Sequence, residues 1–239
     1  SQPREPQPAP LTAGVLGGMG PDATVDFMAK VIAATSAAAD QDHARMLVDH
    51  NPKVPNRQTA LLGNGEDPGP VLAAMAKGLQ DAGADFLVMP CNTAHAFADD
   101  IRAAVSIPLV AIIDVTVEAC RDKGAVGVLV TDGCLSTGMY QDALRLASIE
   151  CVLPNADETA ELMRLISAIK AGDRSEAIAL GMRDIANAQV AKGARTVIAG
   201  CTEIPLVLTD DLLEVPLVSS TDVLAELTAA IASGAHPIT

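Results

Sequence analysis

The sequence has 239 residues, enough for one large domain or for two domains of about 100 to 120 residues, each with its own core. A net charge of -14, with only 16 Lys and Arg, disfavours nucleic acid and anionic membranes as partners. Aromatic residues make up 2% of the chain, which leaves little to stack a nucleobase or to surround a flavin. No apolar run reaches the roughly 18 to 20 residues of a membrane span.

The five cysteines are widely spaced and form no CxxC pair, so reduced thiols and a cytoplasmic location are expected rather than disulfides or a zinc site.

The first half of the chain predicts alternating strands and helices. Residues 1–10 are rich in proline and predict a disordered tail or a remnant of expression. A glycine turn at 17–20 joins the first strand to the first helix, and the polar segment 50–70 is a long connection of the kind that is often functional. The expected strands are 11–16, 45–48, 85–89 and 107–113, and the expected helices are 23–38, 71–82 and 94–105.

The second half repeats this pattern. Its expected strands are 125–130, 149–153, 196–200 and 215–218, and its expected helices are 114–122, 136–147, 157–171, 174–191 and 221–232. Each half carries a strand, glycine turn and helix early, and a strand that ends in a cysteine turn late. The prediction is an α/β fold of two similar lobes, each a three-layer αβα unit with a flavodoxin-like parallel sheet, and an active site in the cleft between them. Residues 11–113 plus about 214–239 are assigned to the first lobe, and 114–213 to the second.

Two cysteines occupy equivalent positions at the ends of strands. Cys91 follows the apolar run 85–88, and Cys201 follows the apolar run 196–200. Unsatisfied N–H groups at a helix start favour an anion, so a thiol there is expected to ionise more easily than a free one. Ligands of parallel sheets bind beyond the carboxyl ends of the strands, which places both thiols at the cleft. Cys120 and Cys151 fit the ordinary role of buried small side chains.

Two thiols that face each other suit proton transfer at a carbon acid. A thiolate removes a proton from one face of the carbon, and a thiol returns another to the opposite face, so stereochemistry inverts without a cofactor. Hydrogen-bond donors beside the cysteines would stabilise the carbanion, and Asn92, Thr93 and Thr202 are placed to contribute.

Three motifs resemble those of a known family. The segments are Gly17-Gly18-Met19-Gly20-Pro21-Asp22-Ala23-Thr24, Cys91-Asn92-Thr93-Ala94-His95 and Gly200-Cys201-Thr202-Glu203. Together they are similar to the cofactor-independent aspartate/glutamate racemase superfamily, and to its aspartate racemase branch in particular, over about residues 11–232. Glutamate racemases typically carry Cys-Thr-His at the second cysteine, whereas Glu203 follows here. The resemblance implies that Cys91 and Cys201 are the two acid/base residues.

The resemblance also implies a substrate site. Arg57 and Lys170 match cations that the family associates with the distal carboxylate of an acidic amino acid. Gln58 and Cys134 each stand where the family commonly has Thr, which leaves the preference among aspartate, glutamate and other amino acids open. Met19 either walls the substrate pocket or packs in the core. Glu203 either polarises a proton relay or stabilises a first helical turn.

Other interpretations remain at this stage. His95 lies four residues after Cys91, a spacing that fits a metal ligand, but a hydrogen-bonding histidine is favoured because no further ligand cluster accompanies it. Within the superfamily a maleate isomerase or hydantoin racemase is the neighbouring alternative. A non-catalytic amino-acid sensor and a redox-responsive thiol protein are alternatives from other classes. The expected partners are a small acidic amino acid and, from the habit of the family, a second copy in a homodimer.

Overall fold

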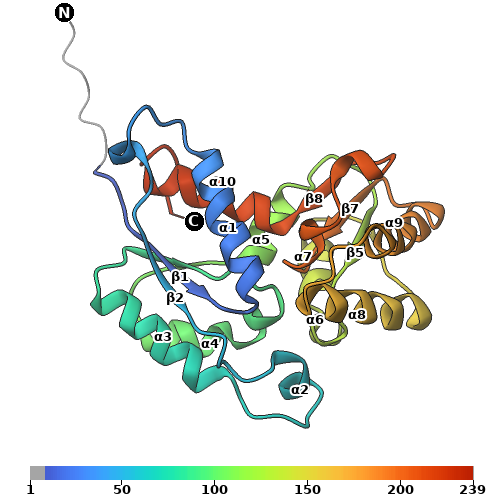
Figure 1. The fold of residues 1–239 in the computed structure, drawn as a ribbon, viewed down its shortest axis with the longest axis horizontal. Helices are drawn as coiled ribbons and strands as arrows, with labels where there is room; N and C mark the ends of the chain where they lie inside the picture. Colours follow the sequence, from blue (N-terminus) through green and yellow to red (C-terminus); the bar gives the residue numbers. More distant parts are fainter. Residues whose placement is uncertain (1–8, 239) are drawn as a thin grey trace, which may run out of the picture.

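The computed structural model describes residues 9–238, which form two four-stranded parallel sheets flanked by helices (Figure 1). The first sheet contains β1 (Ala13–Gly17), β2 (Met46–His50), β3 (Phe86–Val88) and β4 (Leu109–Val110), and the second contains β5 (Val126–Leu129), β6 (Cys151–Val152), β7 (Thr196–Ala199) and β8 (Leu217–Ser219). Their orders, β2-β1-β3-β4 and β6-β5-β7-β8, correspond strand for strand. The predicted two-lobed α/β fold is therefore confirmed, including the flavodoxin-like arrangement. The expected tail lies mostly outside the described residues.

Ten α-helices are found within residues 9–238. They are α1 (Pro21–Ala34), α2 (Arg57–Leu61), α3 (Gly69–Asp81), α4 (Ala98–Ala104), α5 (Ile112–Glu118), α6 (Asp132–Thr137), α7 (Met139–Leu146), α8 (Ala156–Lys170), α9 (Glu176–Ala191) and α10 (Ser220–Ala232). In the described part of the chain, none is long and apolar enough to cross a membrane. Helix α2 lies inside the polar connection, where no helix was predicted. The single helix predicted over 136–147 is instead two helices, α6 and α7, which meet at Gly138, whose φ of 72° breaks the helix.

The strands alternate their side chains between two packed faces. In β3, Phe86 and Val88 join a central core between the two sheets, whereas Leu87 joins an outer core under α3 and α4. In β7, Ile198 reaches the central core and Val197 joins the outer core under α8 and α9. Helix α5 lies between the two lobes, and α10 runs from β8 across the first lobe beside α1 (Figure 1); both contribute to that central core. The two sheets are thus fixed relative to each other by one shared apolar layer.

The end of the chain serves both lobes. β8 pairs in parallel with β7, so residues 217–219 extend the second sheet. The following helix, α10, packs mainly on α1 and α5, and Lys30 of α1 forms an ion pair with Asp222 of α10 at 2.9 Å. The expected division, with all of about 214–239 in the first lobe, differs from this arrangement at β8.

The cysteine turns differ from the expected strand-to-helix turns. After β3 the chain forms a short 3-10 helix, η2 (Thr93–Phe97), before α4. After β7 it forms two 3-10 helices, η3 (Ile204–Leu206) and η4 (Asp210–Leu212), before β8. Neither Cys91 nor Cys201 therefore begins an α-helix. Because short 3-10 segments align few peptide dipoles, the electrostatic help expected for a thiolate at these turns is reduced.

Candidate active site

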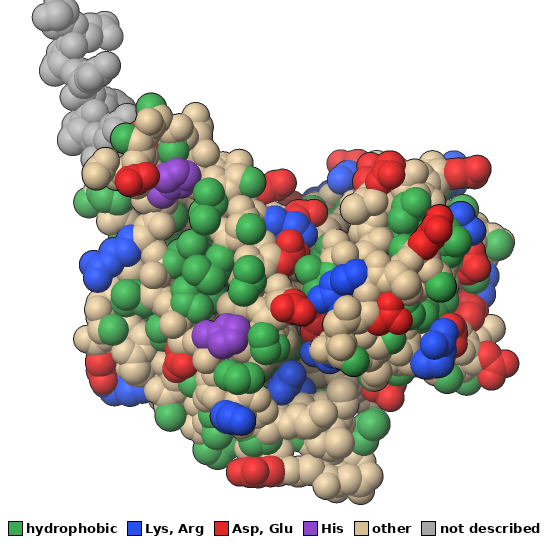
Figure 2. Space-filling view, in the orientation of Figure 1, with side chains coloured by type: hydrophobic (Ala, Val, Ile, Leu, Met, Phe, Trp, Pro, Cys, Tyr) green, Lys and Arg blue, Asp and Glu red, His purple; other side chains and the backbone are tan. Residues whose placement is uncertain are grey.

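A cavity of about 120 Å³ lies beyond the carboxyl ends of strands from both sheets. Nine of its lining residues are predicted site residues: Met19, Arg57, Cys91, Asn92, Thr93, Lys170, Cys201, Thr202 and Glu203. The groove between the two lobes carries charged side chains of both signs (Figure 2). The structure thus brings residues from far apart in the sequence, including both candidate acid/base thiols, to one small space.

The Cys91 turn is held in place by a neutral histidine. His95 Nδ1 lies 2.7 Å from the Cys91 carbonyl oxygen, and His95 Nε2 accepts the Ile112 N–H at 3.1 Å. Since an amide N–H can only donate, Nε2 must be the unprotonated nitrogen and Nδ1 the donor. Burial lowers the pKa of His95 to about 4, although the hydrogen bond to Cys91 opposes this shift. His95 is therefore a hydrogen-bonding residue, and within residues 9–238 no group of three side chains is arranged to hold a metal ion.

The Cys201 turn has a different electrostatic environment. Burial raises the pKa of the Cys201 thiol to about 12, and the negative charge of Glu203 adds to this effect. The backbone N–H of Glu203 and the charge of Lys170 act in the opposite direction but do not offset it. The expectation that this thiol ionises easily is therefore wrong for Cys201, because loss of water and a nearby carboxylate outweigh a short 3-10 turn.

Glu203 is paired with Lys170 at the edge of the cavity. Lys170 Nζ lies 2.6 Å from Glu203 Oε1, with the Glu203 side chain only 3% exposed and that of Lys170 43% exposed. Burial lowers the pKa of Lys170, but the charge and hydrogen bond of Glu203 outweigh it, so the pKa is raised overall. Lys170 is thus a permanent cation at the end of α8, next to both thiols.

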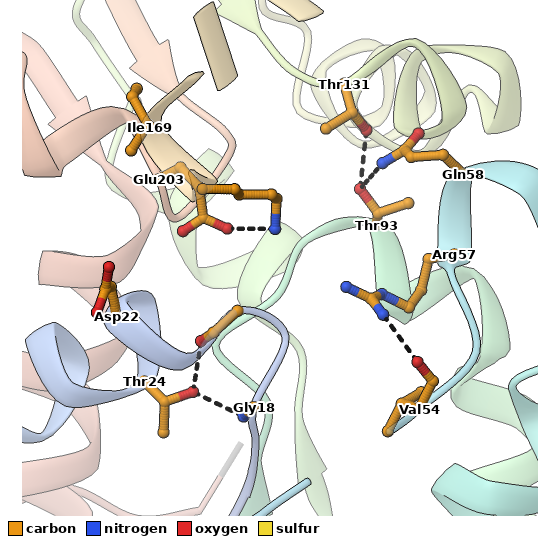
Figure 3. Close-up of polar contacts among 12 residues, drawn as sticks. Gly18, Asp22, Thr24, Val54, Arg57, Gln58, Thr93, Thr131, Ile169 and Glu203 are labelled. Carbon is orange, nitrogen blue, oxygen red and sulfur yellow. Dashed lines mark hydrogen bonds and ion pairs between the residues drawn. The ribbon is translucent and has the colours of Figure 1, made fainter. Parts of the chain in front are cut away.

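Arg57 approaches the cavity from the first lobe. Its Nη1 donates to the carbonyl oxygens of Val54 and Pro55 at 3.3 and 3.2 Å. Among the residues that the structure describes, no carboxylate lies within ion-pair distance of its guanidinium. Figure 3 shows Arg57 and Glu203 pointing toward a common space from opposite lobes. Arg57 therefore offers an uncompensated positive charge to an anionic ligand.

Cys134 does not reach the cavity. It is 1% exposed and belongs to the central core. Burial raises the pKa of its thiol to about 12, and the charge interaction with the nearby Cys91 adds to this shift. Its backbone N–H instead donates to Thr131 Oγ1 at 3.1 Å. Thr131 therefore lines the cavity, and the Cys134 N–H holds its hydroxyl oxygen in place.

Three lining residues, Asn56, Gln58 and Thr131, were not predicted as site residues. Two of them cap helices: Asn56 accepts from the N–H groups of Gln58 and Thr59 at the start of α2, and Thr131 caps α6. Asn and Thr at the first position of such turns are recognisable N-cap signals, so α2 and α6 could have been located from them. That these turns meet across the cleft is visible only in the structure.

The comparisons with known proteins agree with this geometry. The family described as Asp/Glu/Hydantoin racemase matches residues 16–228. The broad specificity amino-acid racemase RacX of Bacillus subtilis is 28% identical over 221 residues, which cover 90% of this chain and 95% of that protein.

Solved structures show the same relationship. Picrophilus torridus aspartate racemase has a TM-score of 0.85 and 28% identity, covering 93% of this chain and 94% of the other. An aspartate racemase homologue from Pyrococcus horikoshii has a TM-score of 0.75 and 26% identity, covering 93% and 99%. The expected resemblance is confirmed: the chain belongs to the Asp/Glu/Hydantoin racemase family and is an amino-acid racemase, an enzyme of the isomerase class.

Proposed function

We propose that this racemase inverts an acidic amino acid, aspartate first, by proton transfer between Cys91 and Cys201. The observation that carries the proposal is the presence of both thiols in one cavity that also contains Arg57 and Lys170. The thiols are suited to the two proton transfers, and the two cations to a substrate with a second carboxylate. The similarity to Picrophilus torridus aspartate racemase supports aspartate, and that to RacX supports tests on further amino acids.

The raised pKa of Cys201 indicates which thiol is protonated at the start of the proposed cycle. At neutral pH Cys201 is a thiol, so the first half of the cycle uses Cys201 as the acid and requires Cys91 as the thiolate base. Cys91 takes the α-proton, the C–H electron pair moves into the substrate carboxylate as an enediolate, and the Cys201 proton is delivered to the opposite face of the carbon. The product leaves with the thiol and thiolate exchanged, ready for the other enantiomer.

The proposed stabilisation of the carbanion comes from fixed polar groups. Asn92 is 2% exposed, donates to Ser220 Oγ at 3.0 Å and accepts from the Tyr140 hydroxyl, so its amide is held in place. Fixed dipoles of this kind do not have to reorient as charge develops. Arg57 and Lys170 would hold the distal carboxylate and exclude neutral substrates of the same size.

Proton NMR in D2O tests the proposal. The fully reduced protein is incubated without added cofactor with L-aspartate, D-aspartate and both glutamates, and the products are separated on a chiral column. We expect loss of the α-proton signal together with formation of the other enantiomer, fastest for aspartate. Absence of exchange with all four amino acids would refute the acidic amino-acid assignment, and hydantoins and maleate would then be tested.

The homodimer and the cytoplasmic location stay proposals, supported by the family resemblance and by the free state of all five cysteines. Light scattering on the purified protein and fractionation of the source cells would test them.

A further inference from the structure

Gln58 connects the two lobes inside the cavity. From the first turn of α2 its Oε1 accepts the Gly133 N–H of α6 at 2.9 Å, and its Nε2 donates to Thr93 Oγ1 at 3.3 Å. Thr93 Oγ1 in turn lies 2.8 Å from Thr131 Oγ1 (Figure 3). Gln58, Thr93 and Thr131 all line the cavity that contains both candidate acid/base thiols.

The orientation of the Gln58 amide follows from its partners. The Gly133 N–H is a donor, and it also points at Asp132 Oδ1 at 2.7 Å, so the Gln58 atom facing it must be an acceptor. The oxygen of Gln58 therefore faces Gly133, and its NH2 group faces Thr93. Glycine at 133 is needed for this approach, because a Cβ there would lie 2.2 Å from Gln58 Oε1.

The hydroxyl hydrogens of the threonine pair can then be counted. Thr93 Oγ1 already accepts from Gln58, and Thr131 Oγ1 already accepts from the Cys134 N–H at 3.1 Å. One hydrogen joins the two hydroxyl oxygens. If Thr131 donates it, Thr93 has both lone pairs occupied and its own hydrogen is left over; if Thr93 donates it, the same is true of Thr131. In either arrangement the pair retains one unused hydrogen, on the hydroxyl whose lone pairs are both occupied, and one unused lone pair on the other hydroxyl. The hydroxyl that is full as an acceptor can only donate.

We propose that Gln58 is a positioning residue that biases the Thr93 and Thr131 hydroxyls toward donating a hydrogen bond to a carboxylate of the substrate. The proposal rests on the acidic amino-acid function proposed above. Without the Gln58 NH2 group the pair would have two unused lone pairs instead of one, and no arrangement would leave Thr93 as a donor only, so its preference for an anion would be weaker. The N-cap of α2 fixes the backbone at Gln58, because Asn56 Oδ1 accepts the Gln58 N–H at 2.8 Å.

Two substitutions of similar size test this role. Gln58→Met keeps the length of the side chain and removes both hydrogen bonds, and we expect it to raise KM about tenfold while kcat changes less than threefold. Gln58→Glu can only accept, so it takes the spare hydroxyl hydrogen and adds a negative charge, and we expect a still larger rise in KM. Gln41→Met, at an exposed position, is the matched control.

A binding measurement separates this inference from the proposed function. Succinate, which has two carboxylates and no α-amino group, is titrated calorimetrically into wild type, Gln58→Met and Gly133→Ala, whose Cβ displaces the Gln58 oxygen. We expect both variants to bind succinate about tenfold more weakly than wild type and the Gln41→Met control, with unchanged unfolding midpoints. A Gln58→Met protein whose KM and succinate affinity stay within twofold of wild type overturns the inference. Failure of wild type to racemise any acidic amino acid overturns the proposed function instead.

Discussion

The two cysteine turns occupy matching places in the two lobes and have different chemical surroundings. Cys91 follows β3 and Cys201 follows β7, which hold the same position in their sheets. Beside Cys91 stands the neutral His95, hydrogen-bonded on both nitrogens, whereas beside Cys201 stands the Glu203–Lys170 ion pair. The repeated fold thus reproduces the placement of the thiols but not their electrostatics. A two-base reaction requires one thiol and one thiolate at the start, and unequal surroundings are a means of distinguishing them.

The largest effects are expected from removal of the thiols. Cys91→Ala and Cys201→Ala should each lower racemisation by at least about 10³-fold, because each removes one of the two proposed proton carriers. Each variant retains a thiol on one side only, so solvent deuterium should enter opposite enantiomers in the two proteins. Deuterium incorporation followed by NMR measures this, with Cys151→Ala as the control. Exchange of the same enantiomer by both variants would show that the thiols do not face opposite sides of the substrate.

The Cys91 turn should be sensitive to acid through His95. The pKa of His95 is about 4 in the folded protein and 6.5 in an unfolded chain. Between pH 6.5 and 4 the unfolded state therefore binds a proton that the folded state does not. Stability should therefore fall as the pH drops from 6.5 toward 4, by about 1.4 kcal/mol per pH unit. His95→Leu should remove this dependence and, by leaving the Ile112 N–H and the Cys91 carbonyl unpaired, cost about 3 kcal/mol at neutral pH.

Urea unfolding at several pH values measures both effects of His95. His43→Leu, at an exposed position, is the matched control and should keep the acid dependence of wild type. An unchanged acid slope in His95→Leu would mean that another group titrates in this range.

The Cys201 turn should be sensitive to alkali instead. The pKa of its thiol is raised from 9.0 to about 12 on folding, so the unfolded state loses a proton first and stability falls as the pH rises through this window. Cys201→Ser keeps the size of the side chain without a thiol and should lessen the slope above 9.0 by about 1.4 kcal/mol per pH unit. Cys134 and Cys120, whose thiols also have raised pKa values, should maintain part of the wild-type slope. Unfolding curves recorded below and above pH 9.0 give the dependence of the free energy of unfolding on pH. The same slope in wild type and Cys201→Ser would contradict the prediction.

The smallest effect is expected at the ion pair that joins the lobes outside the cavity. Arg174 Nη2 lies 2.8 Å from Asp22 Oδ2, with the side chains 35% and 65% exposed. Asp22→Asn should cost about 0.5 kcal/mol or less, and the difference should vanish at high salt. The comparison variant is Asp81→Asn, which removes an exposed pair within a single helix. A decrease of more than about 2 kcal/mol in the free energy of unfolding, measured by urea unfolding, would mean that this ion pair contributes substantially to holding the two lobes together.

Local pattern and long-range placement account for what could and could not be predicted from the sequence. The strands were located because their apolar runs are short and bounded by glycine turns, and the parallel topology followed from the alternation with helices. The pairing of Lys170 with Glu203 could not be derived in this way, because it depends on how the end of α8 meets the turn after β7. The contact of Gln58 with Gly133 depends on the placement of one lobe against the other, which no local pattern contains. The pKa of Cys201 could not be predicted either, because the sequence does not show how deeply the side chain at the end of this strand is buried.

The shared end of the chain bears on how the enzyme can be taken apart. Because β8 completes one sheet and α10 covers the other lobe, a cut near residue 213 would damage both halves at once. We therefore expect that neither lobe can be produced alone as a stable fragment, and that the two do not behave as interchangeable modules in engineered chimaeras. A peptide of residues 214–239 added to the truncated chain should instead restore both lobes together, which makes this segment a natural point for controlling assembly of the enzyme.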